Sequence, residues 1–259
     1  MSLDILQLLL LFIAGVFGGI LNSIAGGGSF ITFPALIFVG VPPIVANATN
    51  TFASCAGYLS GSFAFRRQIL IDRANLPKII TLSILGGFSG SLLLIYTSEQ
   101  QFLYAVPWLL LAATLLFIFG EKANLALQQH SKDSDQHSGF IALFLALFLF
   151  SVGIFGGFFN AGLGVIGLSY LAIAGYRDIN LMNGLKLLIS TCASAMAIVI
   201  FIFSDLIQWY SGIAVMVGTL TGGYVAAHLS QRVPQIIVRR FVIFSSVSIT
   251  LYFFYSTYL

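Results

Sequence analysis

The sequence contains very little charge. Its 259 residues include only eleven Lys and Arg and eight Asp and Glu, while 59% are hydrophobic and the mean hydropathy is +1.02. A soluble domain typically carries about a quarter charged residues to cover its surface. This composition excludes soluble, disordered and fibrous proteins and indicates an integral membrane protein.

Alternating segments of about ten residues, which would predict a transmembrane β-barrel, are also missing. The sequence instead has uninterrupted apolar runs separated by short polar stretches. Runs close to 20 residues long predict helices that cross the bilayer, because a helix satisfies all of its own backbone groups. We therefore expect an all-α integral membrane protein with about 8–10 transmembrane helices.

Motifs of intramembrane enzymes are absent: the sequence has no H-E-x-x-H, no G-x-S-x-G and no paired aspartates inside an apolar run. We therefore expect no enzyme and no cofactor. The eight acidic residues lie at the ends of runs or between them, which disfavours a cation channel or a proton relay. No basic cluster faces aromatic residues, so nucleic acid is not an expected partner.

The apolar runs form two sets of five, separated by a polar stretch at 121–138. These runs are 5–25, 29–39, 44–65, 78–96 and 101–119 in the first half, and 140–163, 165–176, 180–203, 207–229 and 239–255 in the second. The halves also share sequence, since 15–22 reads GVFGGILN and 153–160 reads GIFGGFFN. We predict an internal duplication: a first membrane repeat at 1–120, a connecting loop at 121–138 and a second membrane repeat at 139–259.

Loop charges predict how the two repeats are oriented. In the first half, the stretch after the third run is basic. In the second half, the equivalent stretch holds Asp205 and no cation, and the following stretch is basic instead. The basic residues are Arg66, Arg67, Arg73 and Lys78 in the first half and Arg232, Arg239 and Arg240 in the second. Because Lys and Arg favour the cytoplasm, equivalent loops lie on opposite sides, which predicts the inverted-topology repeats of secondary transporters.

The second run of each half holds only about 12 residues, or about 18 Å of helix, which is too short to span a bilayer. Two arrangements remain open. Each half either crosses five times with a short second helix, or folds its first two runs into a hairpin inside the membrane and crosses three times. We favour a short, glycine-broken helix pair whose turn lies at membrane depth.

The turns between these paired runs are candidate binding sites. They contain Asn22, Gly26, Gly27, Gly28 and Ser29 in the first half, and Asn160 and Gly164 in the second. Glycines before a helix leave backbone N–H groups beside a positive dipole end, which suits a small anion. The alternative is close helix packing, which we expect for the glycine pairs spaced four residues apart, such as Gly15 with Gly19 and Gly153 with Gly157.

The third run of each half begins with a polar face. Asn47 and Asn50 in the first half are spaced like Asn183 and Lys186 in the second, and a serine follows four residues later in both. Lys186 lies well inside an apolar run, and an intramembrane charge indicates function. The alternative is that its side chain extends to the headgroups.

These motifs also resemble a known family. Residues 18–34 read GGILNSIAGGGSFITFP, 46–50 read ANATN and 183–187 read NGLKL, which resembles the sulfite exporter TauE/SafE family over nearly the whole chain. The resemblance implies a bacterial inner-membrane, multi-pass permease that exports small sulfur-containing anions such as sulfite, thiosulfate or sulfonates. The family's motif positions fall on the candidate residues already named, together with Pro34, which has no counterpart in the second half.

We therefore expect a transporter that alternates access around one midplane site. In this hypothesis the turn amides, Asn22, Asn47, Asn160 and Asn183 bind the oxygens of the anion, and Lys186 supplies the countercharge. Expected partners are the small inorganic or organosulfur anion and the lipid bilayer; a homo-oligomer is left open. The alternatives are an anion channel and a membrane assembly subunit that transports nothing itself.

Overall fold

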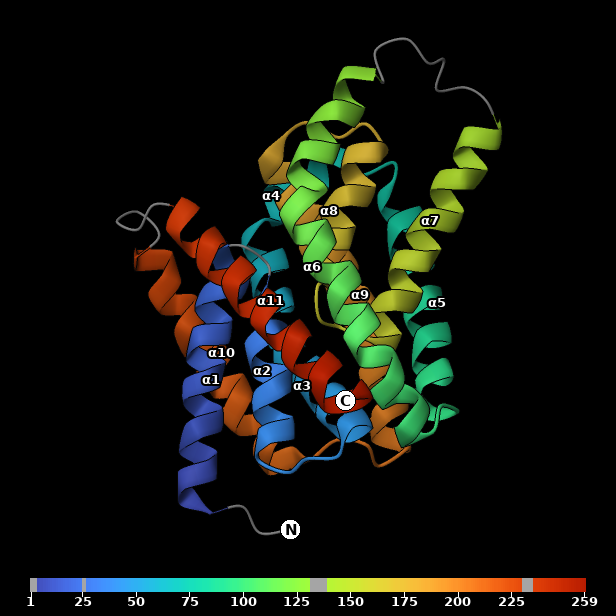
Figure 1. The fold of residues 1–259 in the computed structure, drawn as a ribbon. Helices are drawn as coiled ribbons and strands as arrows, with labels where there is room; N and C mark the ends of the chain where they lie inside the picture. The colour runs from blue at the N-terminus through green and yellow to red at the C-terminus, as the bar shows by residue number, and fades with distance from the viewer. Residues whose placement is uncertain (1–3, 25–26, 131–138, 230–234) are drawn as a thin grey trace.

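A computed structural model describes residues 4–24, 27–130, 139–229 and 235–259, and every regular element in these ranges is a helix (Figure 1). This confirms the predicted all-α class. The α-helices are α1 (Ile5–Ile24), α2 (Ser29–Phe38), α3 (Pro43–Ala64), α4 (Arg66–Ile69), α5 (Leu76–Ile95), α6 (Glu99–His130), α7 (Gly139–Phe158), α8 (Leu163–Ile173), α9 (Ile179–Phe203), α10 (Trp209–Leu229) and α11 (Gln235–Tyr258), and η1 (Leu70–Asp72) is a 3₁₀ turn.

Within the described residues, five helical segments are long and apolar enough to cross a membrane. They are Ile5–Asn22, Leu76–Ile95, Ile141–Phe158, Ile179–Phe203 and Arg240–Tyr258. This number is lower than the expected eight to ten. α3 has 22 residues but is not among the five, because it carries several Asn, Thr and Ser side chains. The described residues therefore form an all-α structure with five candidate membrane spans.

The short helix pair expected at the start of each half is present. α1 is followed by α2, which has 10 residues, and α7 is followed by α8, which has 11. These short helices are about 15–17 Å long, roughly half of a bilayer's hydrocarbon thickness. α6 differs from expectation, because it continues to His130 and makes residues 121–130 of the predicted connecting loop helical; residues 131–138 lie outside the described ranges.

Glycines allow two pairs of helices to pack very closely, α1 against α10 and α5 against α7. A Cβ atom added to Gly15 would lie 3.0 Å from the Cα of Gly218, and one added to Gly153 would lie 2.9 Å from the Cα of Gly86. Such contacts let backbones approach in the way that small residues do in membrane proteins. The packing role expected for these glycines is confirmed.

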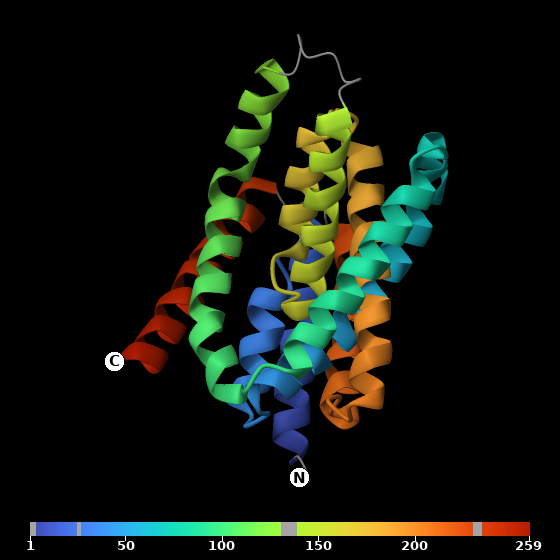
Figure 2. The same ribbon diagram turned by 90° about the vertical axis from the view of Figure 1, so that its right-hand side faces the viewer.

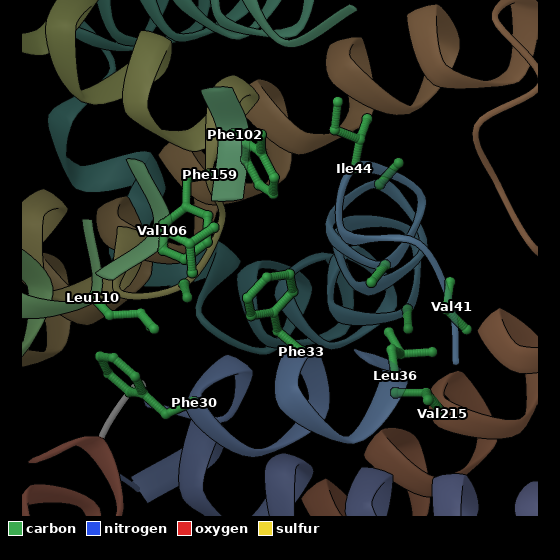
Figure 3. Packing of buried hydrophobic residues seen from close by; sticks show 14 of the residues in the cluster. Phe30, Phe33, Leu36, Val41, Ile44, Phe102, Val106, Leu110, Phe159 and Val215 are labelled. Carbon is green, nitrogen blue, oxygen red and sulfur yellow. The ribbon is translucent and has the colours of Figure 1, made fainter. Parts of the chain in front are cut away.

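Buried aromatic side chains connect the two halves. Figure 3 shows the ring of Phe33, from α2, near that of Phe159, which lies in the break between α7 and α8, and the ring of Phe102 from α6 beside Phe159. Phe30 of α2 belongs to the same buried cluster. The rings of Phe33 and Phe159 meet edge to face with centroids 5.5 Å apart. All four side chains are fully buried, so the break of the second half is packed directly against the short helix of the first.

The glycine contacts predict that Gly153→Ala lowers the melting temperature of the purified protein in detergent. The new methyl group would meet the α5 backbone, and overpacking of this kind costs about 1–3 kcal/mol. Gly57→Ala is the matched control, because its nearest atom would be 3.9 Å away and alanine favours a helix more than glycine. A melting temperature for Gly153→Ala that equals or exceeds that of Gly57→Ala would contradict this account.

Candidate functional site

The break between α1 and α2 contains a glycine that nothing larger could replace. Gly26 lies outside the described residues, while Gly27, Gly28 and Ser29 are buried. A Cβ atom at Gly28 would collide with the carbonyl oxygen of Gly18. The first N–H groups of α2 are not all free, because Phe30 and Ile31 donate to the carbonyls of Gly27 and Gly28 at 3.2 and 3.0 Å.

The break between α7 and α8 has a different construction. Gly162 adopts φ +89°, a left-handed conformation that favours glycine, and it precedes the first residue of α8. The N–H of Leu163 donates to the carbonyl of Asn160 at 3.2 Å, and that of Val165 to Gly162 at 2.9 Å. Gly164, the predicted turn residue, is buried inside the first turn of α8 instead, so Gly162 is the residue that forms the turn.

Asn160 is held by side chains from both halves. The Tyr58 hydroxyl of α3 donates to its Oδ1 at 2.8 Å, and its Nδ2 donates to the Ser194 hydroxyl of α9 at 2.9 Å. Asn160 has no exposed surface, so these bonds satisfy a buried amide. Sequence reasoning missed Tyr58 and Ser194, although each lies four residues after the last serine of a polar face and so continues it by one turn.

Asn47 and Asn50 are buried and only partly satisfied. The Nδ2 of Asn47 donates to the carbonyl of Phe158 at 2.9 Å, which caps the end of α7, and the Oδ1 of Asn50 accepts from the Thr32 hydroxyl of α2. Among the described residues, the Oδ1 of Asn47 and the Nδ2 of Asn50 have no partner. One buried acceptor and one buried donor therefore have free hydrogen-bonding capacity, and burying such groups unpaired is costly.

Lys186 is buried inside α9. Only 8% of its surface is exposed, which argues against a side chain extended to the headgroups. Its Nζ donates to the Oδ1 of Asn183 at 3.3 Å, and no carboxylate in the described part of the chain pairs with it. A Cβ atom added to Gly167 of α8 would lie 3.7 Å from the Cγ of Lys186, so a glycine makes room for the lysine stem.

The candidate residues do not converge on one point. A Cβ atom at Gly61 would lie 2.9 Å from the Cδ1 of Leu187, so Lys186 lies beside the end of α3 that contains Gly61. Asn50 lies eleven residues earlier, about 16 Å away along α3. Asn47 and Asn50 therefore form one group and Asn183 and Lys186 a second, with the Tyr58–Asn160 bond at a level between them.

The loop before α9 is fixed at both ends. Tyr176 donates to Asp72 of η1, and Asp178 caps α9 by accepting from the N–H of Leu181 at 2.8 Å. Burial raises the pKa of Tyr176 above its ordinary value of 10.0, and the hydrogen bond to Asp72 and its negative charge raise it further. These contacts position the start of the helix that carries Asn183 and Lys186.

Comparison with known proteins decides the family. The model of the family "Sulfite exporter TauE/SafE" matches residues 11–253. The chain belongs to this family. No solved structure matches it.

Three curated relatives of this TauE/SafE chain are named as transporters. A "Probable membrane transporter protein" of Haemophilus influenzae is 28% identical over 251 residues, covering 96% of this chain and 95% of the relative. "Probable membrane transporter protein YfcA" of Escherichia coli K12 is 26% identical over 91% of this chain and 85% of the relative. "Probable membrane transporter protein ORF9" of a Sinorhizobium species is 26% identical over 93% of this chain and 90% of the relative. The protein is thus a multi-pass membrane transporter and not an enzyme, as the sequence predicted.

The Tyr176 contact makes a prediction for pH dependence. Tyr176→Phe should lower the melting temperature near neutral pH, because one hydrogen bond contributes about 1 kcal/mol. The raised pKa means that the folded state holds the Tyr176 proton more tightly than the unfolded state. The contribution of the hydrogen bond to stability is therefore complete below pH 10.0 and is lost as the pH rises above this value toward the pKa of the folded state. The two melting curves should therefore converge in alkaline buffer. A difference that is constant or grows with pH would contradict the prediction.

Proposed function

We propose that this protein exports small sulfur-containing oxyanions, such as sulfite, thiosulfate or sulfonates, across the bacterial inner membrane. The observation that supports an anion most directly is Lys186, a buried ammonium without a carboxylate partner among the described residues. Removing such a charge from water is costly unless an opposite charge compensates it. A bound anion provides that charge, and the amide oxygen of Asn183 alone does not.

The asparagines fit the oxygens of such an anion. Asn50 has an unpaired Nδ2 that can donate to an oxyanion, and Asn47 has an unpaired Oδ1 that can accept from a protonated one or from its water. In this proposal, the anion moves between the Lys186 group and the Asn50 group, about 16 Å apart along α3. The two breaks line the path between them and contribute Asn22, Gly26 to Gly28 and Ser29 from one half and Asn160 and Gly164 from the other.

The arrangement of helices supports inverted repeats as the basis of alternating access. α1 packs on α10 and α7 packs on α5, so the first helix of each half has the equivalent partner in the other half. In Figures 1 and 2, α1 begins at the lower end of the molecule and α7 at the upper end. These opposite directions agree with the loop charges, which put equivalent loops on opposite sides.

Export is consistent with the energetics of an anion. An inside-negative membrane potential drives each negative charge outward with about 2.3 kcal/mol per 100 mV. Among the described residues, the acids inside α1 to α11 are Glu99, in the first turn of α6, and Glu121, beyond the apolar run of α6, so no carboxylate lies inside an apolar run for proton coupling. Net flux of the anion driven by the potential alone is therefore the mechanism we propose.

The test is efflux of labelled sulfite, thiosulfate and methanesulfonate from proteoliposomes under a set potential. Lys186→Gln should reduce flux of the best substrate at least about tenfold, which corresponds to losing about 1.4 kcal/mol of interaction. Lys78→Gln makes the same change at an exposed lysine and should leave flux within about twofold.

Two results would refute the proposal. The first is wild-type flux through correctly inserted Lys186→Gln protein, and the second is a wild-type protein that is folded but moves none of the three anions. Accelerated exchange when unlabelled anion is added on the opposite side distinguishes a carrier from a channel, since a channel shows no such counterflow.

A further inference from the structure

Two equivalent asparagines have different surroundings in this structure. Asn22 and Asn160 end the matching segments GVFGGILN and GIFGGFFN. Asn160 is fully buried and bonded to Tyr58 and Ser194, whereas Asn22 is only half-buried. The two asparagines also differ in backbone position, because Asn22 lies in the last turn of α1 and Asn160 lies after the end of α7 at Phe158.

The partners of Asn160 are also an equivalent pair. Tyr58 follows Ser54 by four residues, as Ser194 follows Ser190, and the two serines align in the repeats. α3 and α9 pack against each other, so their two hydroxyls reach Asn160 from opposite halves. If the two halves exchanged conformations, the same two hydroxyls would face Asn22.

Asn22 already lies close to this position. A Cβ atom added to Gly57, the residue before Tyr58, would lie 3.9 Å from the Nδ2 of Asn22, which is an ordinary van der Waals contact. Asn22 thus lies against α3 one residue before Tyr58, without the full burial of Asn160.

We propose that Tyr58 and Ser194 form a shared latch that holds Asn160 in the present conformation and Asn22 in the opposite one. The proposal rests on the alternating access of the proposed function. A buried amide needs partners, so each state satisfies one asparagine inside the protein and leaves the other to water or substrate. In the present state Asn22 is the available one. Tyr58 and Ser194 are therefore positioning residues for the transport cycle.

The latch makes a prediction that a purely structural role does not. Asn160→Ala removes the side chain that Tyr58 and Ser194 hold in the present state, so it should favour the opposite state. Asn22→Ala should favour the present state. Each population ratio should change about fivefold, as expected for loss of one hydrogen bond, and the two changes should have opposite signs.

The readout is labelling by a membrane-impermeant thiol reagent, added from one side or the other. An Asn183→Cys probe is placed beside Lys186 in a Cys55→Ser, Cys192→Ser protein. Its labelling rate from each side of the membrane reports how often the Lys186 region is open to that side. Gln100→Ala, at an exposed amide side chain in the first turn of α6, should leave the rate unchanged. Size-exclusion profiles and melting curves confirm that each variant is folded.

A second measurement tests the role of the tyrosine. Tyr58→Phe keeps the ring and removes the donor, so the effect of Asn160→Ala on labelling should shrink in the Tyr58→Phe background. Rates that change in the same direction for both asparagine variants, or that change for neither, would overturn the latch.

These outcomes are independent of the transported solute. Opposite labelling shifts in a protein that moves no sulfur-containing anion would retain the latch and refute the substrate class. Anion flux together with shifts of the same sign would refute only the latch.

Discussion

Backbone groups that a broken helix leaves open inside a membrane must find partners in the protein, and the rest of this structure depends on that constraint. The partner for the end of α7 comes from the other half, because Asn47 of α3 donates to the carbonyl of Phe158. The next residues of the break are held by Tyr58 and by the ring of Phe33, again from the first half. The break in one half is therefore completed by the side chains of the other.

Part of this organisation could be predicted from the residues themselves. Runs of apolar residues identify helices and consecutive glycines identify a break. Lys186 stands out inside an apolar run, although the sequence alone left open whether its side chain is buried or extends to the headgroups. Polar composition misled at 121–130, where Glu, Lys, Ala, Leu and Gln are good helix formers and extend α6 beyond the apolar run. The turn at Gly162 rather than Gly164 depends on one backbone angle, which composition does not report.

Contacts between the halves were beyond prediction for a different reason. Tyr58 and Ser194 matter because both bond to Asn160, and a single sequence does not say which helix lies opposite α3. The separation of Lys186 from Asn50 follows from Gly61 meeting Leu187, which is a matter of how α3 and α9 cross. The repeat predicts which residues are equivalent, but equivalence alone does not bring them together.

The close packing of α1 on α10 also has a consequence for how the chain matures. Gly15 meets Gly218, about 200 residues further along, so at roughly 5–20 residues per second α1 waits about 10–40 s for its partner to be synthesised. Until then the glycine face of α1 lacks this partner. α5 and α7 are separated in the chain only by α6, so both partners of their contact are synthesised much earlier. The contact of α1 with α10 therefore joins the first helix of the transporter to one of the last that is synthesised.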